Sequence, residues 1–169
     1  MQEELAIAIP DEIDRAFRAH HGMVFRTAYR ITGNAADAED VLQTVFLRLL
    51  RREPRAERVE NEESYLRRAA INTALDVVRS AQSNRTVELP DLPDCHSDTG
   101  RELRQALGRA LSQLKPRQAE VFTLRFLEGF GNAQIARMLG ISQVLVAVIV
   151  HRTRQQLRKE LASYRGDRP

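Results

Sequence analysis

The sequence predicts an all-α protein built from two small helical domains joined by a flexible linker. Apolar residues recur at spacings of three and four along most of the chain, and no stretch alternates with the period of two that marks a strand. The 8 glycines and 6 prolines cluster at the breaks between these stretches. With 169 residues, 43% of them hydrophobic, the chain can bury a core in each of two small domains.

Three helices are predicted in the first half. The first stops at Gly33, and Asn34 is placed to cap the second, whose early carboxylates suit the positive end of a helix dipole. The second helix ends before Pro54, and Asn61 can cap the third after a charged loop at 51–60. We expect the second helix to turn these side chains inward: Val41, Leu42, Val45, Phe46, Leu49 and Leu50. The third is expected to bury Leu66, Ala69, Ala70, Thr73 and Val77.

The helical period fails between Ser80 and Gly100, where prolines and a scatter of Asp, Ser and Thr interrupt it. We therefore expect a first domain at 9–82, an acidic linker at 83–100 and a second domain at 101–165.

Composition favours a soluble cytoplasmic protein. The single cysteine, Cys95, cannot form a disulfide within the chain or a zinc cluster, which fits a reducing compartment. The N-terminus lacks the features of a signal peptide, and no apolar run approaches the roughly 18 residues that span a bilayer. No membrane insertion is expected.

Charge is divided unequally between the two halves. Residues 101–169 hold 13 Lys and Arg against 5 Asp and Glu, whereas residues 1–100 hold 13 against 18. A basic half suggests contact with a polyanion, although a solvated helical surface would also be basic.

A helix-turn-helix is predicted from Asn132 to about His151. Ile135 and Leu139 are apolar, Ala136 is small enough for a helix crossing, and Gly140 can adopt the left-handed turn conformation. Four further residues fit the motif: Ile141 fills the turn, Ser142 can cap the next helix, and Val146 and Val150 face back into the domain. An ordinary helical hairpin with a glycine turn is the alternative. A run of basic residues follows: His151, Arg152, Arg154, Arg158 and Lys159. These residues could bind DNA backbone phosphates or, alternatively, interact favourably with the negative end of the helix dipole.

Three motifs resemble those of bacterial RNA polymerase sigma factors. LSQLKPRQAEVF from Leu111, with LRFLEG from Leu124 and IARMLGIS from Ile135, resembles region 4. DAEDVLQTVFLR from Asp37 resembles the core-binding part of region 2, and YLRRAAINTALDVVR from Tyr65 resembles its promoter-melting helix. Regions 1 and 3 have no counterpart, which is typical of the extracytoplasmic-function (ECF) group of the sigma-70 family.

The resemblance implies partners and site residues. Core RNA polymerase would be bound by Asp37, Glu39, Asp40, Gln43 and Phe46. The separated strand of the minus-ten promoter element would be held by Tyr65, Arg67, Arg68, Asn72 and Arg79, although Tyr65 could equally be a core residue. Minus-35 DNA would be contacted by Arg117, Ser142, Gln143, His151, Arg152 and Arg154. The loop at 51–60 would shape a pocket for a flipped base, and the linker would thread the RNA exit path.

The reading face departs from the family pattern. Where the family carries Lys, Ser and Arg, this chain has Ala147, Val148 and Ile149, which can touch thymine methyl groups but cannot bind guanine edges or phosphate. We expect minus-35 recognition that is weaker, AT-biased or dependent on groove shape. Alternatively, the apolar face docks a protein, such as an anti-sigma factor or a second copy.

Other function classes explain less of the chain. A helix-turn-helix regulator acting without polymerase leaves the Asp37 and Tyr65 motifs without a purpose, and a sigma-mimicking protein-binding regulator is a further alternative. The four histidines do not form a site, and no phosphate loop, HExxH or nucleophile motif is present: His20, His21, His96 and His151. We expect no catalysis, cofactor, metal or small-molecule substrate.

Overall fold

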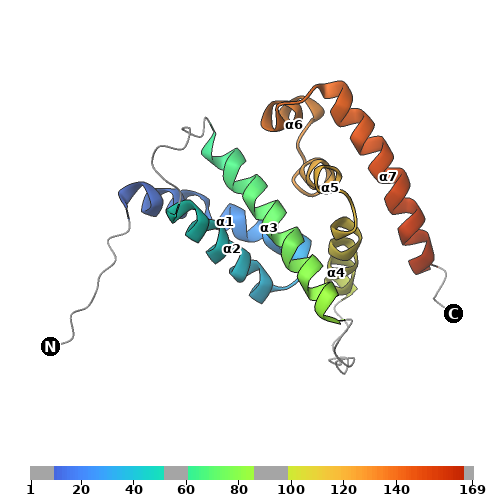
Figure 1. The fold of residues 1–169 in the computed structure, drawn as a ribbon, viewed down its shortest axis with the longest axis horizontal. Coiled ribbons are helices and arrows are strands. Elements are labelled where there is room, and N and C mark those ends of the chain that lie inside the picture. Colours follow the sequence, from blue (N-terminus) through green and yellow to red (C-terminus); the bar gives the residue numbers. More distant parts are fainter. Residues whose placement is uncertain (1–9, 52–60, 86–98, 166–169) are drawn as a thin grey trace.

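The computed structural model describes residues 10–51, 61–85 and 99–165, and these ranges contain helices and no strand (Figure 1). The prediction of an all-α chain is confirmed. The elements are α1 (Asp11–Thr32), α2 (Ala35–Leu50), α3 (Glu62–Arg85), α4 (Thr99–Ser112), α5 (Pro116–Phe122), a π-helical turn η1 (Thr123–Leu127), α6 (Asn132–Leu139) and α7 (Gln143–Arg165). The predicted loop at 51–60 and linker at 83–100 fall largely outside the described residues.

Local signals end and begin the first three helices as predicted. Gly33 closes α1 in the left-handed conformation, with φ 76°, and its N–H donates to the Tyr29 carbonyl at 2.9 Å. The Asn34 side chain accepts from the Asp37 N–H at 2.7 Å at the start of α2. Asn61 Oδ1 accepts from the Ser64 N–H at 2.9 Å at the start of α3.

The three helices α1, α2 and α3 pack against one another around a shared apolar core. The predicted inward residues Val41, Val45 and Leu66 are buried. The prediction for Leu50 was wrong: it is 36% exposed, because it lies at the last turn of α2 on the outer face of the bundle. Four buried residues of α3 were not predicted: Ile71, Ala74, Leu75 and Val78.

The two halves of the chain are packed together. Helix α4 lies along α1 and α3, near the C-terminal end of α3, while α5, α6 and α7 form the other half of the molecule (Figure 1). Gly108 of α4 meets the backbone of α1 so closely that a Cβ there would lie 2.1 Å from the Ile31 carbonyl oxygen. A side chain at position 108 is therefore incompatible with this packing.

Within the described ranges, no single helix is long and apolar enough to cross a membrane. The helices α6 and α7 satisfy the criteria of length and composition only as a pair, bent by 107°.

Candidate nucleic-acid and polymerase interfaces

The helix-turn-helix has the geometry that its sequence predicts. Helices α6 and α7 are bent by 107° about a turn in which Gly140 is left-handed, with φ 63°. The Ile141 N–H donates to the Ala136 carbonyl at 3.0 Å, and Ser142 Oγ accepts from the Leu145 N–H at 3.1 Å at the start of α7. Val146 is fully buried against the domain, and Val150 is half-buried. One face of the first turns of α7 thus packs on the domain, and the opposite face, with Val144, Leu145 and Val148, is exposed.

The free face of α7 is apolar in the structure as in the sequence. Val144 is 74% exposed, and Leu145 and Val148 are exposed by 45% and 39%. Gln143 and Ala147 are exposed on the same stretch of helix. Because this face carries few polar groups, it interacts mainly through van der Waals contacts. Such a face can contact thymine methyl groups in a DNA groove, or an apolar surface of another protein.

Basic groups lie beside this face. His151, Arg152 and Arg154 are exposed on α7. The Arg154 guanidinium lies 5.8 Å from the ring centroid of Phe126, and Arg125 lies 5.9 Å from the same ring. These cations converge around an exposed aromatic ring, an arrangement that suits a nucleic-acid backbone.

Arg117 stands apart from these groups. Its guanidinium donates to the Leu139 carbonyl at 3.2 Å, which satisfies the C-terminal end of α6. Although Arg117 is exposed, its observed contact stabilises the helix-turn-helix.

Four predicted minus-ten residues share one face of α3. Tyr65, Arg68, Asn72 and Arg79 follow one another at helical intervals of three, four and seven residues. Asn72 is exposed, and the other three are half-buried. Arg67 lies to one side of that face.

The three arginines of this surface are bound by the second half of the chain. Arg68 Nε lies 2.7 Å from Glu120 Oε1, and Arg79 Nε donates to the Ser112 carbonyl at 2.9 Å. Arg67 pairs with Glu128. It also pairs with Glu63 of its own helix, where the Arg67 Nη2 to Glu63 Oε1 distance is 2.5 Å.

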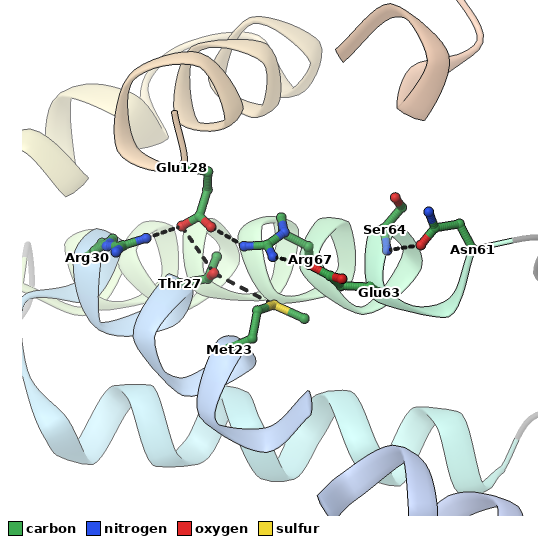
Figure 2. A network of polar contacts seen from close by, with 8 residues as sticks. All are labelled: Met23, Thr27, Arg30, Asn61, Glu63, Ser64, Arg67 and Glu128. Carbon is green, nitrogen blue, oxygen red and sulfur yellow. Dashed lines mark hydrogen bonds and ion pairs between the residues drawn. The ribbon is translucent and has the colours of Figure 1, made fainter. Parts of the chain in front are cut away.

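Glu128 is the centre of a polar network between the two halves. Figure 2 shows its carboxylate pointing from the end of the π-helical turn toward α1 and α3. The Glu128 side chain is only 2% exposed; Oε1 accepts from Arg30 at 2.8 Å and from the Thr27 hydroxyl at 3.1 Å, and Oε2 pairs with Arg67. Arg67 also lies over the ring of Phe130, 5.1 Å from its centroid.

A third surface is an apolar groove between α1 and α2. It is lined by Ile13, Asp14, Phe17, Gln43, Phe46, Leu47 and Leu50. Phe46 packs edge-on against Phe17, with ring centroids 4.9 Å apart, and is itself only 8% exposed. The exposed apolar area instead comes from Phe17, Leu47 and Leu50, at 41%, 48% and 36%.

Of the five predicted polymerase-binding residues, four lie in or beside this groove or on the exposed surface of α2, and one makes contacts within the chain. Gln43 and Phe46 line this apolar groove, and Glu39 and Asp40 are exposed on the same helix. Asp37 instead makes two hydrogen bonds with Asn34 at the start of α2. The Asn34 amide group donates to the Asp37 carboxylate, and the Asp37 N–H donates to Asn34 Oδ1.

The chain matches two sigma-factor family descriptions that together span most of its length. "Sigma-70 region 2" matches residues 16–84, and "Sigma-70, region 4" matches residues 104–157. The chain belongs to the sigma-70 family, in its ECF group. Sigma factors of this kind are non-catalytic transcription initiation factors.

Curated relatives agree with this assignment. The chain is 33% identical over 170 residues to the ECF RNA polymerase sigma factor SigE of Mycolicibacterium smegmatis; the match covers 91% of this chain and 63% of that protein. It is 30% identical over 154 residues to the RNA polymerase sigma-E factor of Streptomyces coelicolor, covering 90% and 87%.

Two solved structures show the same fold. One is the sigma factor RpoE in complex with the anti-sigma factor NepR from Bartonella quintana, with TM-score 0.53 and 19% identity, covering 93% of this chain and 99% of that one. The other is CnrH in complex with the cytosolic domain of CnrY, with TM-score 0.57 and 21% identity, covering 89% and 88%.

Sequence reasoning missed several residues of these surfaces, among them three apolar residues of the groove and two glutamates. Phe17, Leu47 and Leu50 were not recognised as an exposed groove, although Leu47 and Leu50 share a helix face with Asp40 and Gln43. Glu120 and Glu128 were not predicted to contact region 2. A signal for them existed, because they are the only acidic residues from Leu103 to Lys159.

Proposed function

We propose that this sigma factor binds core RNA polymerase and directs promoter-specific transcription initiation in the bacterial cytoplasm, without catalytic activity of its own. The observation that carries the proposal is the presence, in one chain, of a region 4 helix-turn-helix and a separate region 2 bundle with an exposed apolar groove. A regulator that acts on DNA alone needs only the first. The curated relatives' names, which describe RNA polymerase sigma factors, support the same conclusion.

The proposed polymerase-binding surface is the outer face of α2 with the adjoining groove. Leu47 and Leu50 supply apolar area, and Asp40 and Gln43 supply polar groups at its edge. This combination of an apolar centre and a polar rim is typical of protein interfaces. Glu39 contributes charge, Phe46 shapes the floor of the groove, and Asp37 maintains the helix start that presents them.

The proposed minus-ten surface is the face of α3 that carries Tyr65, Arg68, Asn72 and Arg79, with Arg67 beside it. Guanidinium groups bind phosphates and stack on bases, and a tyrosine ring can stack on an unpaired base. Asn72 adds an amide that can bind a base edge.

The proposed minus-35 surface is the start of α7 and its basic flank. Ser142 and Gln143 at the helix start, and His151, Arg152 and Arg154 further along, would contact DNA, while Arg117 acts mainly by holding α6 in place. The apolar stretch between them can contact thymine methyl groups but cannot bind guanine edges. We therefore expect weak, AT-biased discrimination between minus-35 sequences.

Reconstitution with core polymerase tests the proposal. The full chain is mixed with core enzyme, and the starts of run-off transcripts are mapped across a genomic DNA library. We expect a small set of starts with shared upstream elements, absent with core enzyme alone. A chain that binds duplex DNA but neither co-purifies with core polymerase nor produces defined starts would instead be a regulator independent of polymerase.

A second partner is proposed for the apolar face of α7. The exposures of Val144, Leu145 and Val148 leave an apolar patch that an anti-sigma factor could cover. The solved neighbour RpoE is itself in complex with an anti-sigma factor. Analytical ultracentrifugation separates this from self-docking: a monomeric chain at micromolar concentration leaves the face to a different protein, and a dimer lost on Val144→Ser replacement assigns it to a second copy.

A further inference from the structure

The helix-turn-helix carries positive charge that is not neutralised within the described chain. Between Glu128 and Glu160 the sequence has no Asp or Glu. The Lys and Arg side chains of this stretch are all exposed, and none pairs with a carboxylate that the structure describes: Arg137, Arg152, Arg154, Arg158 and Lys159. Helices α6 and α7 therefore present a surface that attracts anions.

The outer face of α7 is apolar at its start and basic further along. Val144, Val148 and Arg152 follow one another at intervals of four residues, so they lie on one side of the helix, and Lys159 continues that side seven residues later. Thr153 is fully buried on the opposite side. The outer face extends for about 22 Å at the rise of an α-helix, and α7 lies along one edge of the molecule (Figure 1).

A partner that covers this face must offer anionic groups and an apolar layer together. Val144, Leu145 and Val148 are exposed by 74%, 45% and 39%, and burying them is favourable only where the partner is apolar. DNA supplies phosphates but only isolated thymine methyl groups. An anionic lipid bilayer supplies both, because its headgroup phosphates lie at the surface and its acyl chains begin within about 5–10 Å of it.

The composition of the two helices supports a lipid partner independently of charge. As a pair, α6 and α7 meet the length and composition criteria for a membrane segment, although they are bent by 107°. Part of this apolar content is buried in the domain, as Ile135 and Val146 show, and part is the exposed start of α7. A folded helix with apolar residues beside cations is typical of helices that lie along a membrane surface.

We propose that the outer face of α7 binds the surface of an anionic lipid bilayer. Val144, Leu145 and Val148 enter the boundary between headgroups and acyl chains. Arg152 and Lys159 bind headgroup phosphates from the same side of the helix. This inference goes beyond the proposed function, because binding to lipid requires neither polymerase nor a promoter.

A bilayer on this face excludes the other partners proposed for α7. Arg152 belongs both to the proposed minus-35 surface and to the lipid surface, so region 4 cannot hold duplex DNA and a bilayer at once. An anionic membrane thus competes with promoter DNA for region 4. An anti-sigma factor seated on Val144 would displace the bilayer in the same way.

A single tryptophan tests whether the start of α7 enters the bilayer. The sequence has no tryptophan, so Val144→Trp places the only indole of the chain at the proposed point of entry. Leu47→Trp is the matched control, because Leu47 is 48% exposed but lies on α2. Each full chain is mixed with vesicles of phosphatidylcholine alone, or of phosphatidylcholine and phosphatidylglycerol in equal amounts. We expect a blue shift of emission, and quenching by brominated acyl chains, only for Val144→Trp with the anionic vesicles.

Co-sedimentation with the same vesicles separates the apolar contribution from the electrostatic one. Val144→Ser should weaken binding about tenfold, because most of a valine side chain no longer gains from burial. Arg152→Gln should weaken it about fivefold, the contribution of one cation near an anionic surface. Leu47→Ser and Arg18→Gln are the controls, since both residues are exposed on α2 and α1, and we expect no change. Circular dichroism confirms that each variant remains helical.

Several results would overturn the proposal. One is the absence of binding to anionic vesicles, which would leave the α7 face to a protein partner, and another is equal binding to phosphatidylcholine alone. Equal losses in Leu47→Ser and Val144→Ser would indicate general hydrophobic adsorption, and anionic binding unaffected by Val144→Ser would indicate adsorption by charge without entry. Duplex DNA should release the wild-type chain from the vesicles, and simultaneous binding of both would refute the shared face.

Discussion

Truncation of Leu47 is expected to weaken binding to core polymerase by about 3- to 12-fold. Burying a leucine side chain completely contributes about 1.5–3 kcal/mol relative to leaving it exposed. Leu47 is 48% exposed in the free chain, so docking removes only about half of its surface from water, which corresponds to about 0.7–1.5 kcal/mol. Leu47→Ala forfeits most of that contribution, and each 1.4 kcal/mol is a tenfold change in Kd.

The measurement is the Kd of fluorescently labelled chain for core enzyme, at an ionic strength near physiological. Leu145→Ala is the matched control, since Leu145 is exposed to a similar extent, 45%, but lies on α7 away from the α1–α2 groove. The reasoning is refuted if Leu47→Ala leaves the Kd unchanged, or if both variants weaken it equally. The second result would mean that general surface hydrophobicity, and not this groove, drives the association.

Three further replacements test the local structure and the DNA surface. Gly140→Ala should lower the free energy of unfolding by about 1–2 kcal/mol in urea, because φ is 63° there and nothing crowds the new methyl group; unchanged stability would contradict the assigned turn. Asn34→Ala should cost about 1 kcal/mol by the same measurement, since it leaves the Asp37 N–H without its cap, and a loss below a few tenths would argue against that bond. Arg152→Ala should reduce the salt dependence of duplex binding, the slope of log K against log salt, by about 1, whereas Arg18→Ala on α1 should leave it unchanged; equal slopes in the two variants would remove Arg152 from the DNA surface.

Features set by neighbouring residues could be predicted from the sequence. The end of α1 at Gly33 and the starts of α2 and α3 at Asn34 and Asn61 depend on caps within three residues of the helix end. The turn of the helix-turn-helix is equally local, because the conformation of Gly140 and the cap from Ser142 need no distant partner. The family motifs themselves are continuous segments, and so they identified regions 2 and 4.

Features that depend on distant segments could not be predicted. The contact of Arg67 with Glu128 joins residues that are 61 positions apart, and neither residue type specifies its partner. Leu50 fits the inward pattern of α2 but lies at its last turn, where the neighbouring helices no longer cover it. The assignments of individual residues to polymerase and DNA remain predictions, of which Arg152→Ala tests one directly.

The π-helical turn at Thr123–Leu127 determines the direction in which the Glu128 side chain points. The Glu128 N–H donates to the carbonyl of Thr123, five residues back, at 3.0 Å, so this turn holds one more residue than an α-helical turn would. Successive residues of a helix are rotated by about 100° about its axis. Deleting Phe126 would therefore restore α-helical winding and swing the carboxylate by about that angle, away from Arg67, without altering any charge. Insertions and deletions in this short segment are thus a means by which related chains could gain or lose the contact while keeping every residue that forms it.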